Sequence, residues 1–161
     1  MRSAFLLRLL PLLVLTALVL AAGHAIAQER EWSLDASEQE AYLIFGVADS
    51  EDVGVSLWCP AHKDVVNLFV PRPTEELQKL GRKHVAMVVK AGAETATFAG
   101  KIEISQDGPN SSVEVEMPVT HPLLKALENA DRFSVEIDRH EVVFPLYDAD
   151  IEGLLDTCRK G

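Results

Sequence analysis

Two cysteines, Cys59 and Cys158, place the tightest constraint on how this chain folds, because no third cysteine competes for either of them. In an oxidising compartment such a pair forms a disulfide, which here closes a loop of roughly 100 residues. Alternation along 53–59 puts Cys59 on the same side of a strand as Val55 and Leu57. We therefore expect the first cysteine to point into an apolar core.

The second cysteine belongs to an amphipathic helix near the end of the chain. The helical spacing i, i+3, i+4, i+7 is followed by Ile151, Leu154, Leu155 and Cys158. Asp148 or Asp150 is expected to cap the start of this helix. The predicted disulfide then fastens the last helix to a sheet. A catalytic redox pair is the alternative, although the chain has no C-x-x-C motif.

The first 27 residues have the pattern of a secretory signal. Positive charge at Arg2 and Arg8 precedes an apolar stretch over 9–22, and residues 25–27 match a small-residue cleavage site. We expect cleavage after Ala27 and a periplasmic or secreted mature chain. A retained membrane anchor is the alternative, although a bilayer crossing needs about 20 apolar residues. A polar lead-in is expected at 28–40 and a single domain at 41–161.

Removal of the leader takes two of the 15 basic residues and none of the 25 acidic ones, so the mature chain has a net charge of −12. Such a surface repels nucleic acid and anionic lipid. It keeps a secreted protein soluble, and it also suits a basic partner. We expect a protein or envelope component as partner, with no nucleic acid and no stable membrane insertion after cleavage. The oligomeric state stays open.

Between the cysteines, apolar residues recur with a period of two, which is typical of half-buried strands. The clearest hairpin joins 95–105 to 113–119 through a loop at 107–111. Gly100 falls on the apolar face of the first of these strands and predicts a bend, a bulge or a close backbone approach. Further strands are predicted at 42–47, 53–59, 66–70, 85–89, 133–138 and 141–146.

Short helices are predicted after Thr74, ending at Gly81, and over 122–129. Together with the strands they indicate a mainly β (α+β) fold. We expect an antiparallel β-sandwich or a partly open barrel, with short peripheral helices and the C-terminal helix tied to the sheet by the disulfide.

Two patterns begin a metal site without completing it. The run from Asp148 through Asp150 to Glu152 imitates a calcium loop, but Arg159 stands where the closing carboxylate belongs, so helix capping is preferred. Cys59 and His62 offer two zinc ligands, but a disulfide consumes the thiol. The chain has no P-loop and no G-x-G-x-x-G motif. We expect neither a metal nor another cofactor.

Catalytic signals are equally sparse. Four histidines follow the leader, and the sequence scatters them over turns, strand ends and outward strand positions: His62, His84, His121 and His140. No G-x-S-x-G elbow is present. A Ser-His-Asp site assembled from distant residues stays open, but the sequence names no catalytic residue.

A binding surface is the more specific expectation. The acidic run that contains Asp49, Glu51 and Asp52 is interpreted as a solvated loop between two strands, with contact to a basic partner as the alternative. Trp58 points away from Cys59, so it lies either in the core between two sheets or on the surface as a binding anchor. The core position is preferred for Trp58.

A family resemblance rests on Trp32, on the strand end Leu57-Trp58-Cys59 and on the closing segment 151–158. In these features the chain resembles the small secreted proteobacterial proteins of the type VI secretion-associated VasI-like group. It is similar, less closely, to invasion-associated locus B proteins. The resemblance implies a bacterial envelope protein without enzymatic activity.

Export, a disulfide-tied β core and missing catalytic signals together favour a non-enzymatic binding module of the periplasm or envelope. One alternative is a proteinaceous inhibitor of a basic envelope hydrolase such as lysozyme, because the net charge of −12 would steer the two together. The other alternative is a hydrolase with an unrecognised site.

Overall fold

The computed structural model describes residues 29–106 and 110–159, so the expected leader and most of the loop predicted at 107–111 lie outside the described residues. The described chain forms one antiparallel sheet in the order β1-β2-β3-β4-β7-β6-β5-β8-β9. The strands are β1 (Glu31–Ala36), β2 (Glu40–Gly46), β3 (Val53–Pro60), β4 (Val65–Pro73), β5 (His84–Ala91), β6 (Glu94–Glu103), β7 (Asn110–Pro118), β8 (Arg132–Ile137) and β9 (His140–Pro145).

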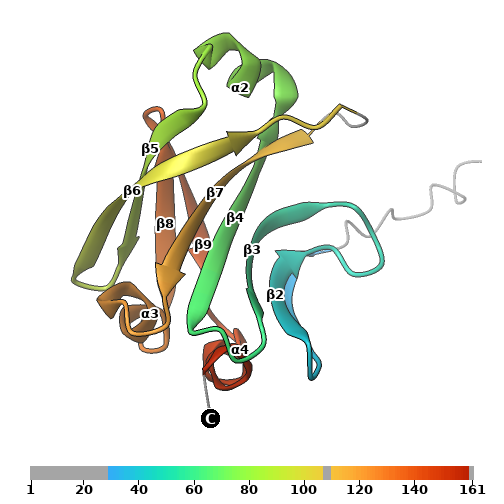
Figure 1. Ribbon diagram of the computed structural model, residues 1–161, viewed down its shortest axis with the longest axis vertical. Helices are drawn as coiled ribbons and strands as arrows, with labels where there is room; N and C mark the ends of the chain where they lie inside the picture. The colour runs from blue at the N-terminus through green and yellow to red at the C-terminus, as the bar shows by residue number, and fades with distance from the viewer. Residues whose placement is uncertain (1–28, 107–109, 160–161) are drawn as a thin grey trace, which may run out of the picture.

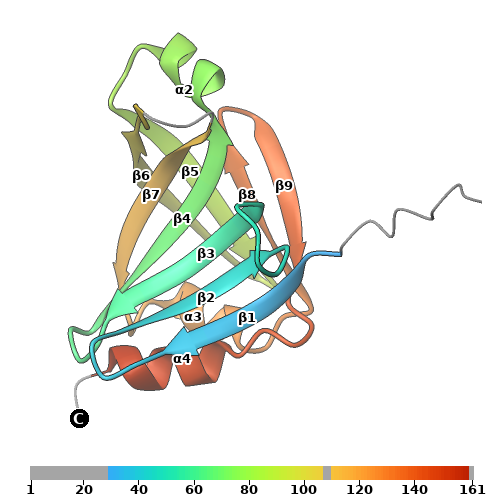
Figure 2. The same cartoon turned by 90° about the vertical axis from the view of Figure 1, so that its right-hand side faces the viewer.

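This sheet curls around its own apolar face into a half-barrel (Figures 1 and 2). In β4, for example, Val66, Leu68 and Val70 point inward and are buried, while the residues between them are half-buried. Successive side chains on a strand face opposite sides, so one core lies within the curve. The predicted mainly β fold with a partly open barrel is confirmed.

In the described chain, three short helices cover the ends of the half-barrel: α2 (Thr74–Leu80), α3 (Pro122–Leu127) and α4 (Ile151–Cys158). Figure 2 places α3 and α4 at one end and α2 at the other. The helix α4 packs its buried stripe against β1 to β4, with Leu154 and Leu155 in the core. Gly81 ends α2 in the left-handed conformation, with φ of 61°, which glycine adopts without a steric penalty.

The stretch expected as a polar lead-in belongs to the sheet, which corrects the sequence analysis. Glu31–Ala36 forms β1, with Glu31 opposite Gly46 and Ala36 opposite Ala41. Trp32 and Leu34 pack against the core from alternate positions, while the other residues of this strand are exposed. Because an edge strand on a curved sheet needs few apolar side chains, its composition looked like that of a loop.

Gly100 confirms the close approach that its place in the sequence predicted. A Cβ atom at this position would lie 2.5 Å from Cγ1 of Val113 and 3.3 Å from the carbonyl oxygen of Val85. Only glycine therefore lets β6 pass this close to its neighbours without displacing a core side chain.

Aromatic side chains join the two edge strands of the sheet. Trp32 on β1 donates its indole N–H to the carbonyl oxygen of Pro145 at the end of β9, at 2.7 Å. The Trp32 ring lies 5.2 Å from Phe45 and 6.4 Å from Phe133, and Phe144 lies 5.2 Å from Phe133. Side chains therefore hold together two edges that no backbone ladder joins in the described sheet.

We expect Trp32→Phe to lower the free energy of unfolding by about 1 to 2 kcal/mol, because it removes one hydrogen bond and part of a packed ring. Trp58→Phe is the matched control on the outer side of the sheet and should change the free energy by about 0.5 kcal/mol or less. Urea unfolding followed by circular dichroism measures both. Equal effects of the two substitutions would show that Trp32 does not join the edges.

Candidate functional site

The C-terminal helix is held to the sheet by a disulfide and by a turn that satisfies its last carbonyls. Cys59 on β3 and Cys158 on α4 form the predicted disulfide, with their Cα atoms 5.6 Å apart and both side chains fully buried. In the turn between β3 and β4, the backbone N–H of His62 donates to Thr157 O and that of Asp64 to Cys158 O, each at 3.0 Å. These contacts give the C-terminus of α4 partners that an isolated helix end lacks.

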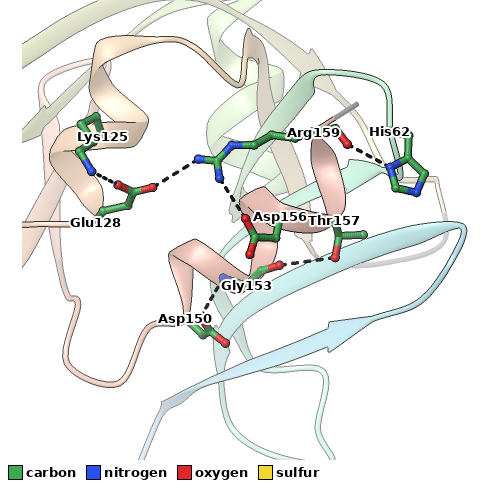
Figure 3. A network of polar contacts seen from close by, with 8 residues as sticks. All are labelled: His62, Lys125, Glu128, Asp150, Gly153, Asp156, Thr157 and Arg159. Atoms are coloured by element: carbon green, nitrogen blue, oxygen red, sulfur yellow. Dashed lines mark hydrogen bonds and ion pairs between the residues drawn. The ribbon is translucent and has the colours of Figure 1, made fainter. Parts of the chain in front are cut away.

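A polar network joins α3 and α4 at the same end of the half-barrel (Figure 3). Arg159 approaches Asp156 at 3.0 Å and Glu128 at 3.6 Å, while Lys125 contacts Glu128 at 2.7 Å. The ring of His62 bonds through Nδ1 to the carbonyl oxygen of Arg159 at 3.0 Å, so Nδ1 is the donor. Each of these side chains has a partner within the protein, which indicates that the network anchors α4.

The calcium-like run caps a helix. Asp150 accepts a hydrogen bond from the backbone N–H of Gly153 at 2.9 Å, as expected for the first residue before α4. Asp148 lies in the preceding turn with φ of 62°. Cys59 is bonded to Cys158, so it cannot serve as a zinc ligand beside His62. Across the described ranges, no group of three or more histidines, cysteines and acids is arranged to hold a metal ion.

The four histidines lie in separate parts of the structure. His62 contacts the end of α4, and His121 caps α3 by accepting the N–H of Leu123 at 3.2 Å. His84 starts β5, and His140 starts β9 beside a pocket beneath α2. Among the residues that the structure describes, no hydrogen bond joins any of the four to a serine hydroxyl.

The pocket beneath α2 has a volume of about 270 Å³ and mixed chemistry. Leu77, Leu80 and Ile137 supply apolar walls, and the lining also includes the charged side chains of Arg72, Glu76, Lys79 and Asp138. Arg72 contacts Glu76 at 2.7 Å, and Arg82 contacts Asp138 at 3.1 Å. Both acidic and basic side chains therefore line the pocket, which does not single out a ligand of one charge.

The structure does not bring the predicted binding residues together. Asp49, Glu51 and Asp52 lie in the loop before β3, where Asp52 forms an ion pair with Arg30. Trp58 lies five residues into β3, toward its other end. At a rise of about 3.3 Å per residue, roughly 17 Å of strand separates Trp58 from the loop. The acidic loop and Trp58 are therefore two separate surfaces.

Trp58 is paired with a tyrosine that the sequence analysis did not single out. The core position preferred for Trp58 is wrong, because the described chain forms one sheet and no second sheet covers this side. Trp58 is half-buried on the outward side, where its ring stacks on that of Tyr42 with centroids 5.9 Å apart and an interplanar angle of 18°. Tyr42 lies directly opposite Trp58 in the ladder between β2 and β3. Alternation in β2 could have placed Tyr42 outward, since Leu43 is a core residue, but the register was needed to set the rings side by side.

The hydrogen bonds of the two tryptophans differ. Trp32 donates its indole N–H to a backbone carbonyl, whereas no hydrogen-bond acceptor within the described chain faces the indole N–H of Trp58. That nitrogen is not buried either, since the described side chains include no buried polar atom without a partner. Trp58 therefore presents a flat ring and an unused donor to the solvent.

We use the name outer face for the outward-pointing positions of β1, β2, β3, β4 and β7, which surround this stack. Its apolar centre consists of Tyr42, Ile44, Trp58, Val65 and Phe69, all half-buried. Its charged members are the carboxylates of Glu31, Asp35, Glu40, Glu114 and Glu116. No lysine or arginine occupies an outward position of these strands. The outer face is therefore apolar at its centre and purely acidic at its margin.

The carboxylates act directly on the aromatic stack. Tyr42 donates its hydroxyl to Glu40 Oε2 at 2.9 Å, and Asp35 lies opposite Tyr42 on β1. The hydrogen bond to Glu40 is the main cause that raises the pKa of Tyr42 above its ordinary value of 10.0. Burial and the charges of Glu40 and Asp35 act in the same direction.

No family model matches the chain, and no curated protein and no solved structure matches it either. Within the described residues, no helix is long and apolar enough to cross a membrane. Function is therefore inferred from the residues and geometry of this chain.

Removing the disulfide through the double substitution Cys59→Ala and Cys158→Ala should lower the free energy of unfolding by about 2 to 5 kcal/mol. The bond spans 99 residues, so its loss frees a long loop in the unfolded chain. Denaturant unfolding measures the change, and the unsubstituted protein under reducing conditions is the control that should behave alike. Two titratable thiols in the native protein would contradict the bond itself.

Glu141 should titrate below its ordinary pKa of 4.5. The Ser134 hydroxyl donates to Glu141 Oε1 at 2.8 Å and is the main cause that lowers the pKa of Glu141, followed by Lys90 at 3.2 Å. Their contribution to stability is complete above the unfolded pKa and is lost as the pH falls through the lower folded pKa. Carboxyl NMR titration tests this, and Ser134→Ala should raise the pKa of Glu141; titration at or above 4.5 in the unsubstituted protein would contradict it.

Proposed function

We propose that the protein is an exported, non-enzymatic binding module of the bacterial periplasm or envelope, and that it holds a protein partner on the outer face. The observation that carries this proposal is the solvent-facing stack of Tyr42 and Trp58, in which the indole N–H lacks an acceptor. Aromatic side chains with a polar handle are enriched among the residues that dominate binding energy at protein interfaces.

Export is supported by the leader pattern of residues 1–27 and by the buried disulfide between Cys59 and Cys158. Disulfides persist in the periplasm and outside the cell, and they are rare in the bacterial cytosol. The resemblance to VasI-like and invasion-associated locus B proteins supports an envelope role. A binding role is supported over catalysis because His62, His121 and Asp150 hold the ends of α3 and α4 in place.

Inhibition of a basic envelope hydrolase such as lysozyme is the second candidate, favoured by the all-acidic margin of the outer face. An inhibitor with such a face would associate rapidly with a basic enzyme at low ionic strength. This candidate is a special case of the binding module, in which the bound partner loses its activity.

We expect affinity capture with the exported chain from an extract of its own envelope to depend on the aromatic stack. Trp58→Ala should reduce the recovered partner at least tenfold, as is typical for a central aromatic anchor. Tyr147→Ala is the matched control, since Tyr147 is 67% exposed and lies outside the outer face. Unfolding of each variant by denaturant checks that the fold is intact. A partner that Trp58→Ala still captures in full would rule out the outer face as the binding surface.

A further inference from the structure

The carboxylates of the outer face have few cations beside them, because no lysine or arginine occupies an outward position of these strands. Some acids in other parts of the described chain are neutralised in ion pairs, as in Arg30–Asp52, Arg82–Asp138 and Lys90–Glu141. Glu31, Asp35, Glu40 and Glu116 form no ion pair within the described chain. Lys101, which lies opposite Glu114 at the border with β6, pairs with Glu103. The outer face thus keeps a local negative potential that the fold does not neutralise.

This uncompensated charge surrounds the aromatic stack. Asp35 is the direct neighbour of Tyr42 across one strand pair, and Glu40 is two residues from Tyr42 on the same strand. Glu116 pairs with Asn67, which in turn pairs with Trp58, so Glu116 lies two strands from the indole. Neighbouring strands are about 4.8 Å apart, which places Glu116 roughly 10 Å from Trp58. Carboxylates therefore lie two strands from Trp58 on either side, within reach of neighbouring basic residues of a segment that crosses the indole.

We propose that the outer face binds a cationic protein segment, in which an arginine or lysine lies over the ring of Trp58 while neighbouring basic residues meet Asp35, Glu40 and Glu116. A guanidinium or ammonium group is attracted to the face of an indole, and nearby carboxylates strengthen that attraction. The proposal rests on the proposed function, which assigns binding to this face, and adds the charge and chemistry of the partner.

The shape of the site favours a protein over a small cation. Tyr42 and Trp58 lie on open sheet: neither lines the pocket beneath α2, the two pockets beside α3 and α4, or the pocket beside the loop before β3. A small organic cation is held by an aromatic cage that surrounds it, whereas an extended or looped protein segment can cover a wide, open surface. The acidic margin also spreads over five strands, from Glu31 on β1 to Glu114 on β7, which a single small cation cannot span.

The test uses the exported chain and a fluorescently labelled nona-arginine peptide, with a glycine–serine peptide of equal length as the neutral probe. Fluorescence anisotropy should show binding of nona-arginine that weakens as salt rises, and no comparable binding of the neutral peptide. In a ¹H–¹⁵N spectrum the indole N–H of Trp58 should shift on titration, and that of Trp32 should not, because Trp32 already donates to Pro145.

Matched charge variants separate a local site from the net charge of the molecule. The triple variant Asp35→Asn, Glu40→Gln and Glu116→Gln should weaken nona-arginine binding at least tenfold. The control triple Glu75→Gln, Glu94→Gln and Glu152→Gln removes the same charge outside the outer face and should weaken it less than threefold. Equal loss in both triples, or an unmoved Trp58 resonance, overturns the proposal.

The same variants distinguish this proposal from the function on which it rests. If the envelope partner is lost in Trp58→Ala but is still bound by the variant Asp35→Asn, Glu40→Gln and Glu116→Gln and at high salt, the outer face is the binding surface. The proposal that its partner is cationic is then wrong. If the partner survives in Trp58→Ala, the outer face is not the binding surface and the proposed function fails as stated. Loss of the partner in both variants, together with its release by salt, supports both proposals.

Discussion

The bond between Cys59 and Cys158 sets the geometry on which the rest of the structure depends. It fixes α4 beneath β1 to β4, where Ile151, Leu154 and Leu155 fill the concave side of those strands. The turn between β3 and β4 then closes over the helix end through His62. A short helix of this kind is marginal in isolation, so the disulfide and the packed stripe have to stabilise it together. The concave side is thereby filled, and only the convex side of these strands is left to meet another molecule.

One strand pair supplies both the anchor of the core and the centre of the outer face. Ala41 and Cys59 are opposite each other and point inward, and the next pair, Tyr42 and Trp58, points outward. A shift of one residue in this register would expose the cysteine and bury the stack, because side chains alternate along a strand. The disulfide therefore holds the register that presents Trp58. Through that register the stability of the fold and the candidate site are linked.

The period of two, the cysteine pair and the helical stripe were sufficient to predict the fold class, because each depends only on local spacing. They were not sufficient for β1, whose two core contacts, Trp32 and Leu34, stand among exposed residues. Pairing of this strand with β2 is a long-range property that composition does not contain. The candidate site was half predicted for the same reason. Trp58 was correctly placed on the strand face opposite Cys59, but the preferred core position was wrong, because it needs a second sheet; its partner Tyr42 depends on the register between β2 and β3.

The net charge of the chain predicted the sign of a partner's charge but not the place where the partner would bind. A value of −12 describes the whole chain without the expected leader, and part of its acidic charge lies beside basic residues in ion pairs. What matters for recognition is where charge is left unpaired close to apolar surface, since an interface gains from both at once. The outer face has that combination because its strands contribute carboxylates and aromatic rings on one side and no base. Acids such as Glu75 add to the net charge without bordering the stack. A partner that depends on the carboxylates of the outer face, and not on acids such as Glu75, therefore recognises where the sheet places its charges and not the net charge alone.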